Sequence, residues 1–170
     1  MSEVDSSLRE AASALRQLDA GERLFLWGFR AMARHYRFGQ PSLEEMREVY
    51  RHFGIEDAVA SLDALIGIFA RAAHSPIETH SPGCPCVSPG ERSLLRAAAA
   101  TQTGALAIGR RALEQWLPSQ AADWATAPLH GLGALFQAAG WRLPLREWGL
   151  AAAPETMATR PWPVAPPTLH

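Results

Sequence analysis

The chain has 170 residues, 48% of them hydrophobic and 19% charged, and a formal net charge of -1. This length and composition are typical of one globular domain, and the charge balance argues against binding to nucleic acid or an anionic membrane by bulk charge. All sixteen basic residues are arginine, and the sequence contains neither lysine nor asparagine. Sites that depend on a P-loop lysine, a Schiff-base lysine or an asparagine are therefore excluded.

The N-terminal residues Met1 to Asp5 are polar and acidic, unlike the basic and apolar start of a secretory signal. The uncharged stretch from Ala97 to Gly109 is too short to span a bilayer. We therefore predict a cytoplasmic location and no membrane contact. The high alanine content, together with the absence of lysine and asparagine, is typical of GC-rich bacterial coding.

Helix start signals recur in the first half of the chain. Asp19 and Glu22 have the spacing of a capping box, in which each side chain caps the backbone amide of the other residue. Ser42 and Glu45 repeat that spacing. Apolar residues follow at intervals of three and four, as on the buried face of a helix. We predict helices over residues 4–18, 20–37, 42–53 and 55–73.

A third capping box, Ser88 with Glu91, opens the second half of the chain, with Pro89 at the first helical position. It predicts a long helix over 89–117. A pair of helices over 119–126 and 128–140 is expected next, interrupted by Pro128 because proline lacks an amide N–H.

No run of alternating β-branched residues predicts a strand. The expected fold is an all-α, single-domain bundle of about six helices over residues 1–150. Residues 151–170 contain five prolines and predict an extended tail.

The loop over residues 74–87 contains the most distinctive cluster of the sequence, with two histidines and two cysteines close together. Cys₂His₂ is a common tetrahedral ligand set for zinc, and the prolines of the loop restrict its unfolded conformations. We predict that a metal, zinc, binds this loop and staples two long helices. The predicted ligands are His74, His80, Cys84 and Cys86. Further possible ligands are Glu78, Glu91 and His130.

Two other interpretations of the loop stay open. Only Pro85 separates Cys84 from Cys86, whereas common zinc modules space their cysteines by two to four residues. The loop could be a proline-rich connector in which the cysteines pack as small hydrophobic groups. It could also hold a redox-active thiol pair. Because Cys86 lies just before the helix start at Ser88, the helix dipole is expected to favour its thiolate and to make it react faster than Cys84.

Arginines recur at helical spacing along 20–37 and continue on the next predicted helix. Such an arginine stripe could bind phosphates or an acidic partner. Nearby glutamates could instead pair with it and leave an ordinary solvated face. The stripe consists of Arg23, Arg30, Arg34, Arg37, Arg47 and Arg51. The segment 42–62 has the pattern of a helix-turn-helix, but Glu56 and Asp57 at the start of its second helix would repel phosphates, so nucleic acid is not expected.

No G-x-S-x-G, H-E-x-x-H or G-x-G-x-x-G motif is present, and no catalytic residue is predicted. The sequence predicts a non-enzymatic helical protein with a regulatory or adaptor role and a zinc-binding loop. One alternative is a metal-free module that binds a protein partner, or a second copy of the chain, through the arginine stripe or through the tail around Trp162. The other is a thiol-based redox sensor or enzyme centred on Cys86.

Overall fold

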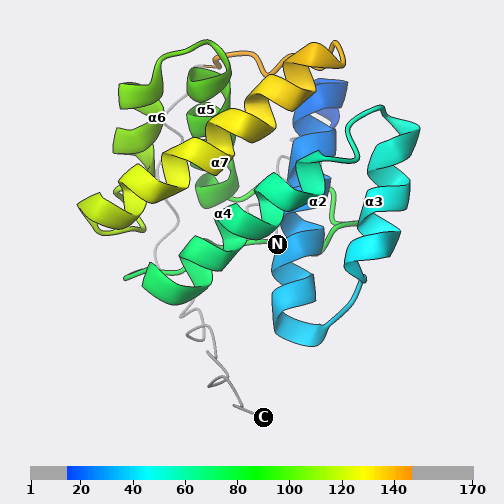
Figure 1. The fold of residues 1–170 in the computed structure, drawn as a ribbon, viewed down its shortest axis with the longest axis horizontal. Coiled ribbons are helices and arrows are strands. Elements are labelled where there is room, and N and C mark those ends of the chain that lie inside the picture. Colours follow the sequence, from blue (N-terminus) through cyan, green and yellow to red (C-terminus); the bar gives the residue numbers. More distant parts are fainter. Residues whose placement is uncertain (1–14, 147–170) are drawn as a thin grey trace, which may run out of the picture.

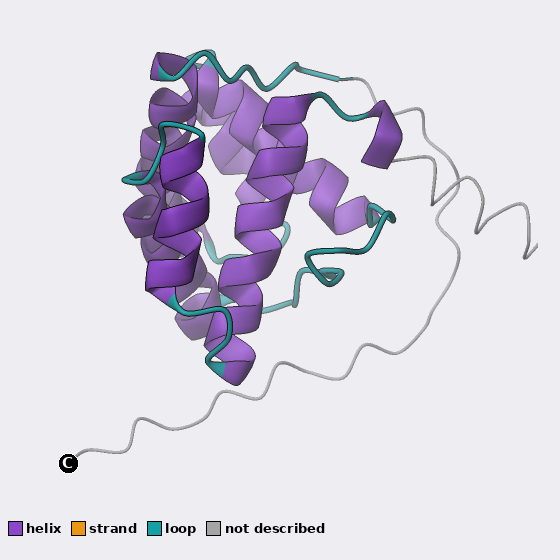
Figure 2. Cartoon of the chain, turned by 90° about the vertical axis from the view of Figure 1, so that its right-hand side faces the viewer, coloured by secondary structure: helices purple, strands orange, loops and turns teal. Residues whose placement is uncertain are grey.

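The computed structural model describes residues 15–146, and all regular structure in this part of the chain is helical (Figures 1 and 2). The elements in chain order are η1 (Leu15–Gln17), α2 (Ala20–Phe38), α3 (Leu43–His52), α4 (Ala58–Ala72), α5 (Pro89–Gln102), α6 (Leu106–Leu113) and α7 (Ser119–Ala138). The predicted all-α fold is confirmed. Most of the helix predicted over 4–18, and the tail 151–170, lie outside the described residues.

The capping boxes set three of the helix starts, as predicted. At α2, the backbone amide of Asp19 donates to the carboxylate of Glu22 at 2.7 Å. At α3, the hydroxyl of Ser42 accepts from the amide of Glu45 at 3.2 Å, and the Glu45 carboxylate accepts from the Ser42 amide at 2.6 Å. These contacts provide hydrogen-bond partners for amides that have none inside the helix. The third box, at α5, is part of the candidate site.

Two helix boundaries differ from the prediction. The helix expected over 89–117 is divided into α5 and α6, because Gly104 between them has a φ of +84°, in the left-handed region that glycine adopts easily. The pair expected around Pro128 is instead one helix, α7. Proline removes one backbone hydrogen bond, but Ala125 and Leu129 on either side of it are fully buried and hold α7 against the core.

Helices α4 and α7 lie side by side across one face of the molecule, and α2 and α5 lie behind them (Figure 1). Aromatic side chains fill the space between the layers. The ring of Phe136 on α7 meets Phe25 of α2 and Tyr50 of α3 edge to face, with 6.2 Å between ring centroids in each pair. The hydroxyl of Tyr50 donates to the carbonyl of Leu24 at 3.2 Å. Burial raises the pKa of Tyr50 well above its usual value.

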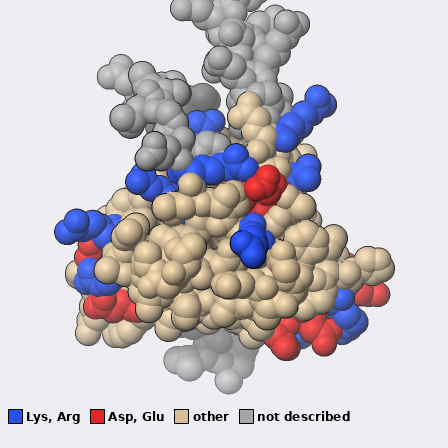
Figure 3. All heavy atoms as spheres, turned by 90° about the horizontal axis from the view of Figure 1, so that it is seen from above, with Lys and Arg blue, Asp and Glu red and all other residues tan. Residues whose placement is uncertain are grey.

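Figure 3 looks down on the end of the bundle where α7 ends and α2 begins. Charged side chains gather mainly towards the edges of this view, and its middle is largely uncharged. None of the helices in residues 15–146 is both long and apolar enough to cross a membrane.

Candidate functional site

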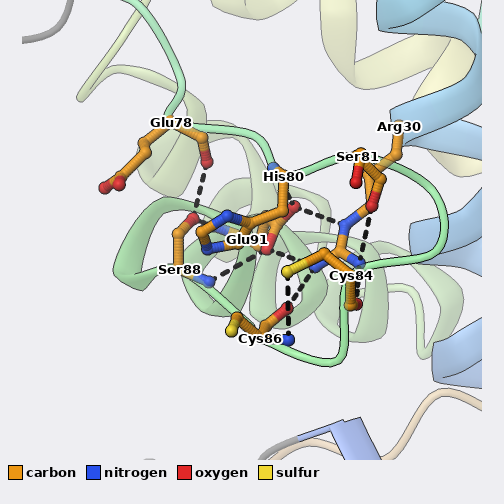
Figure 4. A network of polar contacts seen from close by, with 8 residues as sticks. All are labelled: Arg30, Glu78, His80, Ser81, Cys84, Cys86, Ser88 and Glu91. Atoms are coloured by element: carbon orange, nitrogen blue, oxygen red, sulfur yellow. Dashed lines mark hydrogen bonds and ion pairs between the residues drawn. The ribbon is translucent and has the colours of Figure 1, made fainter. Parts of the chain in front are cut away.

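A buried ion pair lies beneath the loop that connects α4 to α5 (Figure 4). Arg30, in the middle of α2, is 2% exposed, and Glu91, in the first turn of α5, is fully buried. The Nε of Arg30 donates to one carboxylate oxygen of Glu91 at 2.6 Å, and its Nη2 donates to the other at 2.7 Å. This two-point arrangement is the strongest geometry for an arginine–carboxylate pair. The pair joins α2 directly to α5.

The other donors of Arg30 bind the backbone of the loop. Its Nη1 donates to the carbonyl oxygens of Cys84 at 2.9 Å and Ser81 at 3.4 Å. Its Nη2 also donates to the carbonyl of Cys86 at 2.5 Å. A guanidinium has five N–H groups, and these contacts, with the two to Glu91, use them all. Arg30 is therefore a frame for the loop and has no donor left for a ligand.

Glu91 and Ser88 complete this frame from the side of α5. The carboxylate of Glu91 also accepts from the amides of His80 at 3.1 Å and Ser88 at 2.9 Å. The hydroxyl of Ser88 donates to the carbonyl of Glu78 at 2.6 Å and accepts from the amide of Glu91 at 3.0 Å. Burying two charges costs several kcal/mol per ion unless their polar atoms are paired. Full pairing offsets that cost and fixes residues 78–88 in one conformation.

The predicted metal-binding function is wrong for the part of the chain that the structure describes. No group of three or more histidine, cysteine, aspartate or glutamate side chains within residues 15–146 is arranged to hold a metal ion. His74 lies against the end of α6, where its Nε2 is 3.4 Å from the carbonyl of Glu114 and its amide donates to the carbonyl of Trp116 at 2.9 Å. Beneath this loop, Arg30 and Glu91 join α2 to α5.

The other candidate ligands have different surroundings. Glu91 is held by Arg30 and by loop amides, and the Nδ1 of His130 is 3.0 Å from the carbonyl of Thr101 on α5. His80 is among the residues that line a cleft between the loop and the last turns of α2. Zinc was predicted as a cofactor only from the cluster of His74, His80, Cys84 and Cys86, and it stays a prediction.

The two cysteines are the part of the predicted cluster that lies together. Both are free thiols, partly exposed, and the amide of Cys86 donates to the Sγ of Cys84 at 3.4 Å. The contact with the Cys84 thiol raises the pKa of Cys86, burial raises it further, and the positive charge of Arg30 only partly opposes these effects. The helix start was expected to favour a Cys86 thiolate, and this pKa shift has the opposite direction. A raised pKa leaves less thiolate at neutral pH, which argues against a redox or nucleophilic centre at Cys86.

A basic cleft of about 170 Å³ lies where the last turns of α2 face the loop. It is lined by Arg30, Ala33, Arg34, Arg37, Phe38, Thr79, His80, Ser81 and Pro82. Within residues 15–146, the lining of the cleft includes no acidic residue. Arg30 is paired with Glu91, and Arg34 and Arg37 are the other two arginines that line the cleft. Their guanidinium carbons lie 5.4 and 6.0 Å from the centre of the Phe38 ring, a cation–π distance that helps to fix both side chains.

The six arginines of the predicted stripe do not all lie on the surface of the protein. Arg30 is buried and not on the surface. The helical spacing of the sequence indicates that Arg30 is buried, because Arg30 lies four residues after Leu26 and three before Ala33, both of which are buried. On α3, Arg47 and Arg51 do form exposed ion pairs with glutamates, as on a solvated face. The basic cleft was not predicted, since it depends on how the loop folds over α2.

Comparison with known proteins adds no family to this picture. No family model, no curated protein sequence and no solved structure matches the chain at a significant level.

Proposed function

We propose that this protein is a non-enzymatic binding module whose basic cleft recognises a phosphate group carried by a protein partner. The observation that carries the proposal is the composition of the cleft, which has a volume of about 170 Å³. Arg34, Arg37, Thr79, His80 and Ser81 are among the described residues that line it, and none of those described residues is acidic. Arginine matches phosphate oxygens in a two-point geometry, and hydrogen bonds to a charged group are stronger than neutral ones.

The frame beneath the cleft supports this function. Thr79, His80 and Ser81 belong to a loop whose backbone is fixed by Arg30 and Glu91. A site formed before its ligand arrives loses less conformational entropy on binding. The stacking of Arg34 on Phe38 acts in the same way, because it restricts a long side chain that would otherwise have to be ordered.

The test is a calorimetric titration of the full chain at low salt with O-phosphoserine and, separately, with serine. We expect O-phosphoserine to bind and serine not to bind. Replacing Arg34 with glutamine should weaken binding by about tenfold to a hundredfold, because one charge-assisted hydrogen bond contributes about 1.5–3 kcal/mol. The matched control is Arg47→Gln, which removes the same charge from α3 and should leave the affinity unchanged. Equal effects of the two substitutions, or no binding of O-phosphoserine, would contradict the proposal.

A further inference from the structure

A second hollow, separate from the basic cleft, is lined mainly by aromatic and aliphatic side chains. It has a volume of about 350 Å³ and lies between the first half of α2, the end of α3 and the segment that follows α7. Its lining residues are Ala20, Arg23, Leu24, Trp27, Val49, Phe53 and Trp141. We call it the aromatic groove.

The aromatic side chains of this groove are held in place by their neighbours. The indole Nε1 of Trp141 donates to the carbonyl of Phe53 at 3.1 Å, and the two rings lie edge to face with 5.8 Å between centroids. Trp27 packs on the buried ring of Tyr50 at 5.6 Å. Phe53 is nevertheless 40% exposed and Val49 36% exposed. The groove therefore presents a fixed apolar surface to solvent.

One end of the groove is acidic. An adjoining hollow of about 460 Å³ is lined by Glu45, Glu48, Val49, His52 and Phe53, so it shares Val49 and Phe53 with the groove. The Glu45 carboxylate accepts from the amide of Ser42, and this contact lowers its pKa. A segment that fits both hollows would be apolar along most of its length and carry a positive charge at one end.

The chain itself leaves the described structure beside this groove. Arg146 is its last residue, and its Nε donates to Glu22 at 2.9 Å while its Nη2 lies 3.2 Å from Asp19. Both acidic residues lie at the start of α2, next to Ala20 and Arg23 in the groove lining. The 24 residues 147–170 follow this point.

The sequence beyond Arg146 has the features that the two hollows require. Arg160 comes directly before Pro161-Trp162-Pro163-Val164-Ala165-Pro166-Pro167, which contains the P-x-x-P spacing from Pro163 to Pro166. Proline-rich segments lose little entropy when they bind as extended helices in grooves lined by aromatic side chains.

The length of chain before this segment is sufficient. The fourteen residues 147–160 can span up to about 50 Å, whereas a helix of the length of α2 measures only about 28 Å.

We propose that residues 160–167 of this chain bind the aromatic groove, with Trp162 and the prolines against Trp27, Phe53 and Trp141 and with Arg160 towards Glu45 and Glu48. The groove is then a peptide-binding surface occupied by the protein's own tail. A proline-rich segment of another protein has to compete with a tethered ligand, whose effective concentration is in the millimolar range for a short flexible tether.

The test uses NMR on the full chain. We expect nuclear Overhauser contacts between the ring protons of Trp162 and those of Trp27, Phe53 or Trp141. The substitution Trp162→Ala should shift the indole N–H resonances of Trp27 and Trp141, whereas Trp124→Ala, which removes an exposed tryptophan on α7, should leave them in place. If the resonances of the groove are the same with and without Trp162, the proposal is overturned.

A second experiment measures the binding of a separate peptide of residues 158–169. It shows whether the tail occupies the groove or the groove is only an apolar surface. The peptide should bind the Trp162→Ala variant at least tenfold more tightly than it binds the unmodified chain, because the groove has been vacated. Glu48→Arg should abolish that gain, and a peptide carrying Arg160→Glu should restore it. Equal binding to both chains, or no binding to either, overturns the proposal. The proposal is also overturned if the tail of a second copy of the chain occupies the groove. Sedimentation velocity would then show a concentration-dependent dimer that is lost in the Trp162→Ala variant.

Discussion

The guanidinium of Arg30 and the carboxylate of Glu91 meet at 2.6 and 2.7 Å although the two residues are 61 positions apart in the chain. This contact joins α2 to α5 beneath the loop that was predicted to bind a metal. It also gives the loop over residues 78–88 its shape, because the same two side chains bind three loop carbonyls and two loop amides.

Removing one partner of this buried pair should be strongly destabilising. Arg30→Met leaves the buried Glu91 charge without its partner, and we expect a loss of about 3–5 kcal/mol in the free energy of unfolding. Arg30→Met combined with Glu91→Leu removes the unpaired charge but still leaves the carbonyls of Ser81, Cys84 and Cys86 without Arg30 as their donor, so it should recover only part of that loss. Urea denaturation of the three proteins measures both values, with Arg47→Met as the exposed control, expected within about 0.5 kcal/mol of the unmodified chain. A single substitution that costs less than about 1 kcal/mol would be inconsistent with a fully buried pair.

The second prediction concerns the stability of the protein after treatment with a metal chelator. Since the loop is held by Arg30 and Glu91, prolonged dialysis against a chelator should leave the thermal midpoint of unfolding unchanged, and elemental analysis of the purified chain should show no stoichiometric zinc. A drop in the midpoint of several degrees on chelation, reversed by added zinc, would show that a metal contributes to folding.

The thiol pair should respond to pH in a defined direction. Because Cys84 raises the pKa of Cys86, alkylation of Cys86 should reach half its maximal rate at a higher pH than alkylation of an ordinary exposed cysteine. Cys84→Ala should move this midpoint to lower pH and speed the reaction near neutrality. Rates from peptide mapping after timed alkylation decide this. An unchanged midpoint in the variant would mean that Cys84 is not the cause.

Two helical glycines make a matched pair for a packing test. A Cβ at Gly28 would lie 1.7 Å from the hydroxyl oxygen of Tyr50, whereas a Cβ at Gly131 would meet only the Oγ of Ser61 at 3.5 Å. We expect Gly28→Ala to destabilise the protein by about 3 kcal/mol or more through overpacking. Gly131→Ala should be neutral or stabilise it by up to about 1 kcal/mol.

The second substitution that tests this close contact is Tyr50→Phe. Combined with Gly28→Ala, it removes the hydroxyl nearest to the new methyl group and should recover part of the stability, as judged by urea denaturation. Equal effects of the two glycine substitutions on the unmodified background would contradict the packing between α2 and α3.

The features that the sequence predicted correctly are local ones. The starts of α2, α3 and α5 follow from capping boxes, whose residues are three positions apart and need no tertiary contact. The continuity of α7 through Pro128 was missed because burial of both flanking turns outweighs the lost backbone hydrogen bond.

The candidate site was harder to predict because it depends on contacts between residues that are far apart in the chain. A helical period can place Arg30 on a buried face, but nothing local indicates that its partner is Glu91, whose spacing to Ser88 already explains it as a helix cap. The histidines and cysteines are close in sequence, yet the loop directs His74 to the end of α6 and His80 to the basic cleft. These four residues are close in sequence but do not converge on one point in space.

The most direct test of the framed loop is native-state hydrogen exchange at the backbone amides of His80 and Ser88, which donate to Glu91. We predict that both exchange slowly in the unmodified chain, and that in Arg30→Met they exchange fast while amides in the buried part of α7 stay protected. If the amides of His80 and Ser88 exchange at the rate of an unstructured loop in the unmodified chain, Arg30 and Glu91 do not hold this loop in place.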